Sequence, residues 1–426
     1  MIERAAAFAR GCLNLVLGRP ATPILFAGAT LGPDDVSIVK EALRDPASWV
    51  EGDAVAEYER AFAAYLGTAS AFSFSAGREA FSALLEAFGI GEGDEVVLPG
   101  YTCVVVPNAL RYRGIVPRYV DIELETYGPD VSRVEAALTG RTRAILIHHL
   151  YGLVCRDYEA LLALGRARGI PVIEDCAQSL GARFRGTPVG RLGDGAFFSS
   201  EQSKVICTGM GGIATAADPA VAARLADVQR KTPWPKPDTV HRRLVQLRRL
   251  YLDSHPRWQW AYRTFSPEGR AVARRDASVW LESTASAELQ GPRPSDYGRR
   301  LPNALARIGL NQLAKLDGLN ALRQKAAAHW RAWAEREGYA APLELPESEP
   351  IYLRFPVRVP PAMKQDLSWG VELGAEIGAW FLTQTHPLCA GDPVLKDLPK
   401  AREAVACCVN LPCSPRNLPD NGGTQP

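Results

Sequence analysis

Apolar positions along residues 70–215 alternate between two spacings. Stretches with apolar residues at helical spacing, such as Phe81, Leu84, Leu85 and Phe88, are followed by short runs of consecutive apolar residues. The predicted helices cover residues 77–88, 131–138 and 158–168, and the predicted strands cover residues 95–99, 117–121, 144–148 and 171–175. Short apolar strands separated by amphipathic helices predict an α/β fold with a mostly parallel sheet, flanked by helices on both faces. Ligands bind at the carboxyl ends of strands in such sheets, so the residues that follow each strand are the candidates for a site.

The pattern changes in the second half of the chain. A long helix is predicted over residues 305–337, a strand over 352–355 and a helix near 374–380. We therefore expect a large domain over residues 1–295, with an N-terminal arm at 1–30 and an insertion at about 230–295. A smaller α+β domain should follow over residues 296–413. The Pro-, Asn- and Gly-rich end, residues 414–426, is expected to be a mobile tail.

Composition places the chain among ordinary globular proteins. The chain has 426 residues, of which 47% are hydrophobic and 23% charged, and its net charge is +2. These values exclude a disordered chain, a fibre and a coiled coil, and no apolar run is long enough for a transmembrane helix. A net charge so close to zero also argues against nucleic acid as a partner of the whole molecule. We expect no membrane contact for the molecule as a whole.

The nine cysteines are odd in number and lack the spacing of a zinc site. The first residues, Met1-Ile-Glu-Arg, do not resemble a secretory signal. Free thiols in a reducing cytoplasm are therefore expected, and no metal site. Cys176 and Cys207 lie near the candidate site residues described below. A cysteine in such a place more often packs as a small buried hydrophobic residue than acts as a reactive thiol.

Although the net charge of the whole chain is close to zero, one segment is strongly basic. Residues 230–275 contain 12 Lys or Arg against three acids, with Trp234, Trp258 and Trp260 among them. This segment is expected to be irregular or helical. Three interpretations remain open: a solvated surface, recognition of a phosphate-bearing substrate such as a nucleotide sugar, and contact with a membrane surface.

Three predicted strand ends carry polar residues suited to chemistry. Phe74-Ser-Ala-Gly-Arg78 is a small-residue turn into a helix, which suits either a phosphate or a plain helix cap. Glu174 and Asp175 end a buried strand, where each acid needs a partner. Lys204 follows Phe197-Phe-Ser-Ser-Glu-Gln-Ser and precedes a glycine-rich stretch. A lysine in such a place can act as a nucleophile towards an aldehyde. An aldehyde partner, an acid for a ring nitrogen and a phosphate cup together suggest pyridoxal 5′-phosphate.

Several ordered stretches resemble the DegT/DnrJ/StrS sugar aminotransferases, a family of fold-type I pyridoxal-phosphate enzymes. The resemblance extends from about Pro33 to Pro412. The matching stretches include Ser75-Ala-Gly-Arg-Glu-Ala80, Gly91-Glu-Gly-Asp-Glu-Val-Val-Leu-Pro99, Ile173-Glu-Asp-Cys-Ala-Gln-Ser-Leu-Gly-Ala182, Pro188-Val-Gly-Arg-Leu-Gly-Asp194 and Ile308-Gly-Leu-Asn-Gln-Leu-Ala-Lys-Leu-Asp317.

The resemblance implies a role for each matching residue. Lys204 is similar to the Schiff-base lysine, Asp175 to the aspartate on the pyridine nitrogen, and Gln178 to the side chain over the 3′-oxygen of the cofactor. Ser199 resembles a phosphate-binding serine of the family. The resemblance further implies a homodimer that uses L-glutamate to aminate a keto group, most often on a nucleotide-linked sugar.

Other positions depart from the family pattern or extend it. Gly77 and Arg78 match the pair whose backbone amides hold the phosphate, although the family usually has Thr where Arg78 stands. Arg78 can then pair with the phosphate or lie on a solvated helix face.

The family stacks an aromatic residue on the cofactor ring where this chain has Cys103. Tyr101, two residues earlier, is the alternative.

An asparagine that the family borrows from the partner subunit is replaced by Gly298. Arg299 and Arg300 are therefore candidates for a phosphate of the substrate or of the partner subunit's cofactor. His149 is a third polar candidate there, with a structural hydrogen bond as the alternative role, and no metal ligands accompany it at ligand spacing.

Three alternatives to a sugar aminotransferase remain. A related pyridoxal-phosphate enzyme could act on a non-sugar carbonyl or catalyse dehydration, but the family's dehydratases replace the lysine with histidine. A non-catalytic regulatory member would not need Lys204, Asp175 and Gln178 together. A dinucleotide-dependent dehydrogenase would need a glycine fingerprint after the first strand, and the sequence has none there.

Overall fold

The computed structural model describes residues 30–255, 259–277, 279–282, 284, 286–387, 395 and 397–414. The expected N-terminal arm, apart from residue 30, and the expected tail after residue 414 lie outside the described residues, as do Trp258, Cys12 and Cys389. None of the helices in the described ranges has the length and apolar composition that crossing a bilayer requires.

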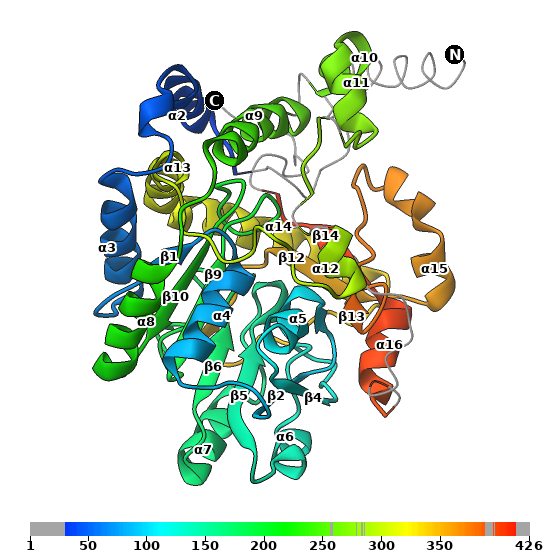
Figure 1. Ribbon diagram of the computed structural model, residues 1–426. Helices are drawn as coiled ribbons and strands as arrows, with labels where there is room; N and C mark the ends of the chain where they lie inside the picture. The colour runs from blue at the N-terminus through cyan, green and yellow to red at the C-terminus, as the bar shows by residue number, and fades with distance from the viewer. Residues whose placement is uncertain are drawn as a thin grey trace.

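A seven-stranded sheet forms the centre of the molecule (Figure 1). Its strands, in spatial order, are β1 (Phe72–Phe74), β10 (Gly212–Ala216), β9 (Gly195–Ser199), β6 (Val172–Asp175), β5 (Thr142–His148), β2 (Glu95–Pro99) and β4 (Val116–Val120). Strand β10 is antiparallel to both of its neighbours, and the other pairs are parallel. The predicted mostly parallel α/β sheet is confirmed.

Helices cover both faces of this sheet. One face carries α4 (Gly77–Ala87), α5 (Val105–Arg111) and α8 (Pro219–Lys231), seen in front of the sheet in Figure 1. The other carries α2 (Pro33–Arg44), α3 (Ala54–Leu66), α6 (Val131–Ala137), α7 (Tyr158–Arg168) and α13 (Asn303–Ala314). Strand β5 shows why two layers form. Ala144 and Leu146 point into the first core, and Ile145 and Ile147 into the second.

The strand register brings the predicted site residues to one edge of the central sheet. Asp175, the last residue of β6, is level with His148 at the end of β5 and with Phe197 in β9. Ser199 ends β9, and β1 ends at Phe74, just before the turn into α4. The carboxyl ends of these parallel strands therefore lie at the same edge of the sheet.

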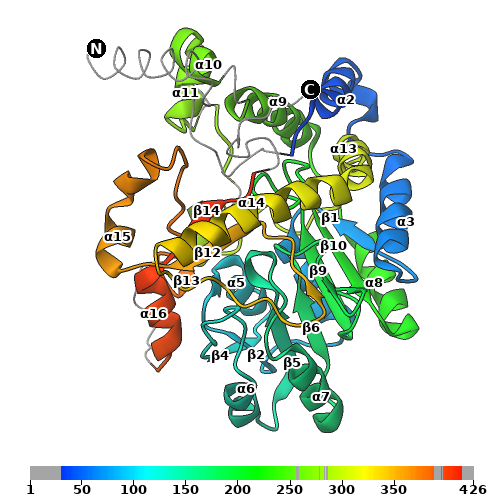
Figure 2. The ribbon, with the colours of Figure 1, turned by 180° about the vertical axis from the view of Figure 1, so that it is seen from behind.

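The basic insertion was expected to be irregular or helical, and it is helical. It contains α9 (Pro237–Asp253), α10 (Gln259–Phe265), α11 (Pro267–Ala273) and α12 (Ser286–Gln290), and α10 and α11 project from the body in both ribbon views (Figure 2). Its few acids pair with some of the basic residues. Glu268 binds both Arg248 and Arg249, and Asp253 binds Arg263.

A smaller unit packs beside the carboxyl edge of the sheet. The long helix α14 (Leu316–Arg336) crosses behind the β12–β14 pair in Figure 1 and lies in front in Figure 2. The other elements are β12 (Arg354–Arg358), β14 (Cys408–Pro412), α15 (Pro361–Gln365) and α16 (Pro399–Cys407). Buried residues of α14, β12, α16 and β14 form a core of their own together with Tyr101, Tyr127 and Tyr151. Helix α13 belongs instead to the large core. The domain boundary near residue 296 stays a prediction.

Two predicted helices differ from the structure. The single helix expected over residues 305–337 is divided between α13 and α14 at Lys315, whose ammonium group binds Asp34 and Asp35 at 2.7 and 2.5 Å. The helix predicted near residues 374–380 is wrong. Gly378 exchanges two backbone hydrogen bonds with Asn410 of β14, at 2.9 and 2.7 Å, so this segment runs as an extended neighbour of the strand.

Short elements complete the described chain. They are the small sheet of β7 (Arg183–Phe184), β8 (Thr187–Pro188) and β11 (Ser348–Glu349), the pair β3 (Thr102–Cys103) with β13 (Thr385–His386), and the 3₁₀ turns η1 (Pro46–Ser48), η2 (Leu150–Gly152) and η3 (Leu367–Val371).

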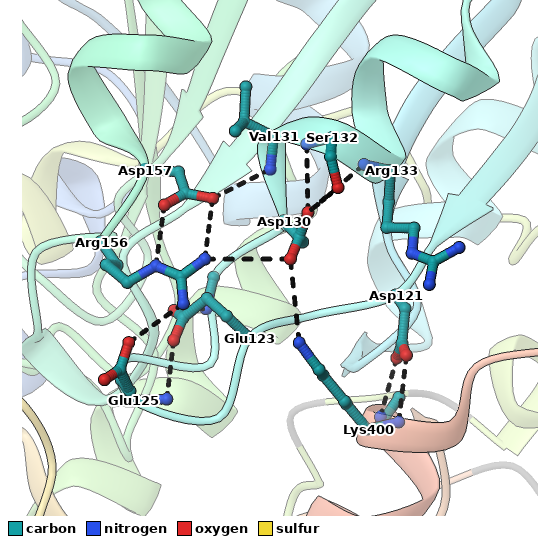
Figure 3. Close-up of polar contacts among 12 residues, drawn as sticks. Asp121, Glu123, Glu125, Asp130, Val131, Ser132, Arg133, Arg156, Asp157 and Lys400 are labelled. Carbon is teal, nitrogen blue, oxygen red and sulfur yellow. Dashed lines mark hydrogen bonds and ion pairs between the residues drawn. The ribbon is translucent and has the colours of Figure 1, made fainter.

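A polar network attaches α16 to the sheet (Figure 3). The carboxylate of Asp121, directly after β4, accepts hydrogen bonds from the backbone N–H groups of Lys400 and Ala401 at 3.0 and 2.9 Å. These N–H groups lie in the first turn of α16, where a negative charge stabilises a helix. The ammonium group of Lys400 lies 3.8 Å from Asp130, which also caps α6. The small unit is thus held beside the edge of the sheet where the strands end.

Candidate active site

A cavity of about 720 Å³ opens at the carboxyl edge of the sheet. Nine of the predicted site residues line it, namely Gly77, Arg78, Cys103, His149, Asp175, Gln178, Ser199, Lys204 and Arg299. They come from strands β3, β6 and β9, from helix α4, and from the segments that follow β5, β6, β9 and the insertion. Tyr101 and Arg300 are not part of its wall.

The two consecutive acids at the end of β6 face different surroundings. Glu174 is fully buried and accepts hydrogen bonds from Tyr158, Gly190 and Gly193, each at 2.6 Å. Burial alone raises the pKa of Glu174, but hydrogen bonds, first of all from His149, hold this pKa below its ordinary value. Asp175 instead reaches the cavity. Burial raises the pKa of Asp175 to about 6, and the hydrogen bond from the backbone N–H of Ala177 at 3.0 Å and the positive charge of Lys204 oppose this rise only in part. Of these two acids, Asp175 therefore faces the cavity and Glu174 belongs to the core.

His149 supports Glu174. Its Nε2 lies 3.0 Å from Glu174, and its Nδ1 accepts the backbone N–H of Cys155 at 3.2 Å, so Nε2 is the protonated nitrogen. Both ring nitrogens are engaged in the core, and this geometry does not support a direct contact of His149 with a substrate or a phosphate. Cys176 lies close to the same two side chains. Hydrogen-bond donors surround the Glu174 carboxylate. The group of His149, Glu174 and Cys176 is therefore a hydrogen-bonded part of the protein core.

The amino end of α4 forms part of the cavity wall. Gly77 begins the helix, and a Cβ atom at Gly77 would lie 2.9 Å from the Cβ of Ser199, so a side chain there would force the helix away from β9. The first N–H groups of a helix have no acceptor within it and suit an anion. Ser199 adds a hydroxyl group beside them. The Arg78 guanidinium lies 2.6 Å from the buried carboxylate of Glu288 on α12, so this side chain is not a solvated charge.

Tyr101 lies in the core of the small unit instead of over the cavity. It is fully buried, its hydroxyl lies 3.0 Å from that of Tyr151, and its ring packs edge-on against Phe381. Cys103 does line the cavity, and β3 places it level with His386 of β13. His386 also lines the cavity; burial, together with Arg354 and Lys364, lowers the pKa of His386 to about 4, so the ring is neutral at pH 7.

The two candidate arginines before α13 have separate positions. Arg299 lines the cavity, and its backbone N–H donates to the buried carboxylate of Glu79 in α4 at 3.1 Å. The guanidinium of Arg300 lies 3.9 Å from the ring centre of Trp234, so this arginine packs on the insertion. Of the two, only Arg299 is placed to reach a ligand in the cavity.

Two helices brace the loop that carries Lys204. Arg323 of α14 is buried and donates to the backbone carbonyl of Val205 at 2.6 Å and to Asn320 at 2.6 Å. Gln312 of α13 accepts the backbone N–H of Cys207 at 3.2 Å. These contacts fix the main chain immediately after Lys204 and leave its side chain on the cavity wall.

Comparison with known proteins identifies this arrangement. A model of the DegT/DnrJ/EryC1/StrS aminotransferase family matches residues 30–421. The chain belongs to this family. The predicted resemblance, fold type and enzyme class are confirmed, and the cofactor is pyridoxal 5′-phosphate.

The similar proteins differ in what their names say they act on. The chain is 32% identical over 353 residues to an L-glutamine:scyllo-inosose aminotransferase of Streptomyces griseus, which covers 82% of this chain and 73% of that protein. It is 40% identical over 180 residues to a GDP-perosamine synthase of Caulobacter vibrioides, but this match covers only 42% of this chain and 48% of that protein. The solved structure of the aminotransferase TlmJ from Streptoalloteichus hindustanus has a TM-score of 0.66 and 25% identity, over 90% of this chain and 91% of that one.

The residues of this aminotransferase fit its cofactor. Asp175, an acid with a raised pKa, is suited to a protonated ring nitrogen. The carboxamide oxygen of Gln178 accepts the backbone N–H of Tyr151 at 2.9 Å, which leaves its amino group for a ligand. The close approach of Gly77 to Ser199 forms a small-residue cradle that suits a phosphate.

Sequence reasoning missed several residues of the cavity. Trp380 and Phe381 come from an irregular segment, His386 comes from the short strand β13 that follows it, and Lys236 and Arg243 come from the insertion. The excess of positive charge in residues 230–275 was the one sequence feature that pointed to Lys236 and Arg243.

Replacing Arg323 with methionine should weaken the brace behind Lys204. The Val205 carbonyl loses its partner, so we expect the free energy of unfolding to fall by about 1–3 kcal/mol. The measurement is urea unfolding of the holoenzyme. Lys325→Met, an exposed position on the same helix, is the control and should change stability little. Equal stabilities of the two variants would contradict a bracing role.

Proposed function

We propose that this aminotransferase converts a keto group on a nucleotide-linked sugar to an amine, with L-glutamate as the donor. The observation that carries the proposal is the convergence of Lys204, Asp175, Gln178 and Ser199 on one cavity of about 720 Å³. Its size is in the range of sites that bind small molecules and cofactors. The GDP-perosamine synthase among the similar proteins supports a nucleotide-sugar acceptor.

The proposed roles of the residues follow from their positions. Asp175 holds the proton on the ring nitrogen of the cofactor, Gln178 orients the ring, and Ser199 with the amino end of α4 binds the phosphate. The bound cofactor supplies an electron-withdrawing ring that stabilises negative charge at the carbon next to the amine. The Nζ of Lys204 then accepts the proton from the α-carbon of the donor and later returns a proton as general acid.

Two further features of the proposal concern the assembly and the compartment. We propose a homodimer, which light scattering on the purified holoenzyme tests directly. We propose the reducing cytoplasm as its location, supported by free thiols at the seven cysteines that the structure describes.

The test is a panel of acceptors with two donors. Keto sugars linked to UDP, GDP and dTDP, and scyllo-inosose as a non-nucleotide acceptor, are each incubated with the holoenzyme and either L-glutamate or L-glutamine. Mass spectrometry should show an amine product from at least one nucleotide sugar. Amination of scyllo-inosose alone, with glutamine, would replace the proposal by a cyclitol aminotransferase, which the Streptomyces griseus protein favours as the second candidate. No product from any pair would contradict both.

A further inference from the structure

Helix α9 of the insertion forms part of the cavity wall. We propose that Arg243, on this helix, binds a phosphate or diphosphate group of the amine acceptor and so selects an acceptor of that class. The inference rests on the proposed function, because it names the charged group that the acceptor presents to the same site. Arg243 belongs to the basic segment whose role the sequence left open.

The packing of α9 places Arg243 beside the loop that carries Lys204. Gln246 donates to Gln202 of that loop at 3.2 Å. The side chain of Leu247 lies 3.1 Å from where a Cβ atom on Gly209 would stand. Residues three and four apart share a face of a helix, so Arg243 lies one turn earlier on the face that Gln246 and Leu247 turn towards this loop.

The guanidinium of Arg243 is only partly paired. Its Nη2 donates to the backbone carbonyl of Glu282 at 3.3 Å, whereas its Nη1 is buried and has no hydrogen-bond partner among the residues that the structure describes. Burial, together with the positive charges of Arg78 and Arg242, lowers the pKa of Arg243, while Glu201 and Asp296 act in the opposite direction. Burying a cationic donor without a partner costs free energy, which an anion in the cavity would offset.

The surroundings favour an anion with more than one charge. From the described part of the insertion, the cations that line the cavity are Lys236, Arg242, Arg243 and Arg275, and the acid is Glu282, with Asp296 directly after the insertion. Each of the two carboxylates of L-glutamate, the proposed donor, carries a single charge, and three carbon atoms separate them, so they are two separate anionic groups. A diphosphate carries at least two charges, and its oxygens match the planar fork of a guanidinium group. The phosphate of the cofactor has its own cradle at Gly77 and Ser199.

The test measures binding without turnover. Isothermal titration of the holoenzyme with UDP, GDP, dTDP and inorganic pyrophosphate should give a dissociation constant that rises about tenfold or more in Arg243→Gln, the loss typical of a charged hydrogen bond. Arg243→Lys should lie between the two, because it keeps the charge and loses the fork. The matched control is Arg248→Gln on the same helix, which removes an equal charge from a side chain that pairs with Glu268 and is not part of the cavity wall. This control should bind as the wild type does.

Several outcomes would overturn the inference. They are the absence of diphosphate binding to the wild type, equal binding by Arg243→Gln, and an equal loss in the Arg248→Gln control. A loss of bound cofactor in Arg243→Gln that parallels its loss of diphosphate binding, read from the visible absorbance of the holoenzyme, would make Arg243 a residue of the cofactor site and overturn the inference. Amination of a keto sugar nucleotide with an unchanged KM in Arg243→Gln would overturn this inference alone. Arg243-dependent diphosphate binding by an enzyme that aminates no such sugar would overturn the proposed function alone.

Discussion

The Lys204→Ala variant should lose amine transfer by about 10⁴-fold or more, the upper end of what one general acid–base group contributes. The structure places this lysine on the wall of the cavity that also contains Asp175, and holds the main chain after it through Arg323 and Gln312. Alanine leaves that loop without an amine to bind the cofactor or to carry a proton. No other lysine among the described residues lines the cavity except Lys236, which lies on the insertion.

Two measurements check this loss. The visible absorbance of the lysine-bound cofactor should disappear from Lys204→Ala, and steady-state turnover with any productive acceptor should fall to background. Lys231→Ala, at an exposed position near the end of α8, is the control and should match the wild type in both. Thermal unfolding of the two variants should agree, which excludes misfolding as the cause. Full activity of Lys204→Ala would contradict the assigned mechanism.

Four of the seven strands of the central sheet, β2, β4, β5 and β6, could be predicted from the sequence because each is a short segment rich in apolar residues that alternates with amphipathic helices. The site residues followed, since Asp175, Ser199 and Lys204 come at or just after a strand end, and parallel strands bring such positions together. The strand order and register, including the antiparallel strand β10, came from the structure.

Other parts of the site depend on contacts that no local pattern records. Tyr101 was a candidate for stacking because it precedes Cys103 by two residues, but its hydroxyl pairs with Tyr151, 50 residues away, and this pairing turns it into the core of the small unit. His386 reaches the cavity through the parallel pairing of β13 with β3, which joins segments about 280 residues apart and consists of two residues in each strand. In the sequence, Arg243 is only one of the twelve basic residues at 230–275. That its side chain lines the cavity depends on how α9 packs on the loop that carries Lys204.

The Asp175→Asn variant should lose kcat/KM by about 10²- to 10³-fold, the effect of removing one preorganised charge from a reacting centre. Asparagine has nearly the shape of aspartate but cannot hold a proton on the ring nitrogen, so the cofactor becomes a weaker electron acceptor. The loss should appear in kcat, because the phosphate contacts at Ser199 and the amino end of α4 remain. A kcat/KM equal to that of the wild type would contradict the assigned role of Asp175.

A variant of the neighbouring acid, Glu174, shows whether the loss of activity in Asp175→Asn comes from the chemistry or from a weakened fold. Burial raises the pKa of Asp175 to about 6, so at pH 7 the folded apoenzyme holds a poorly solvated carboxylate, and Asp175→Asn should leave its stability unchanged or higher. Glu174 has a lowered pKa, so its contribution to stability is present above the ordinary pKa of the group and is lost as the pH falls below it. Glu174→Gln disturbs the hydrogen bonds from Tyr158, Gly190 and Gly193, and should lower the free energy of unfolding of the apoenzyme by about 1–3 kcal/mol at pH 7. Urea unfolding of both apo variants, set beside their kcat/KM values, decides between the roles. A strongly destabilised Asp175→Asn apoenzyme would mean that Asp175 supports the fold, and its lost activity could then no longer be assigned to the ring nitrogen.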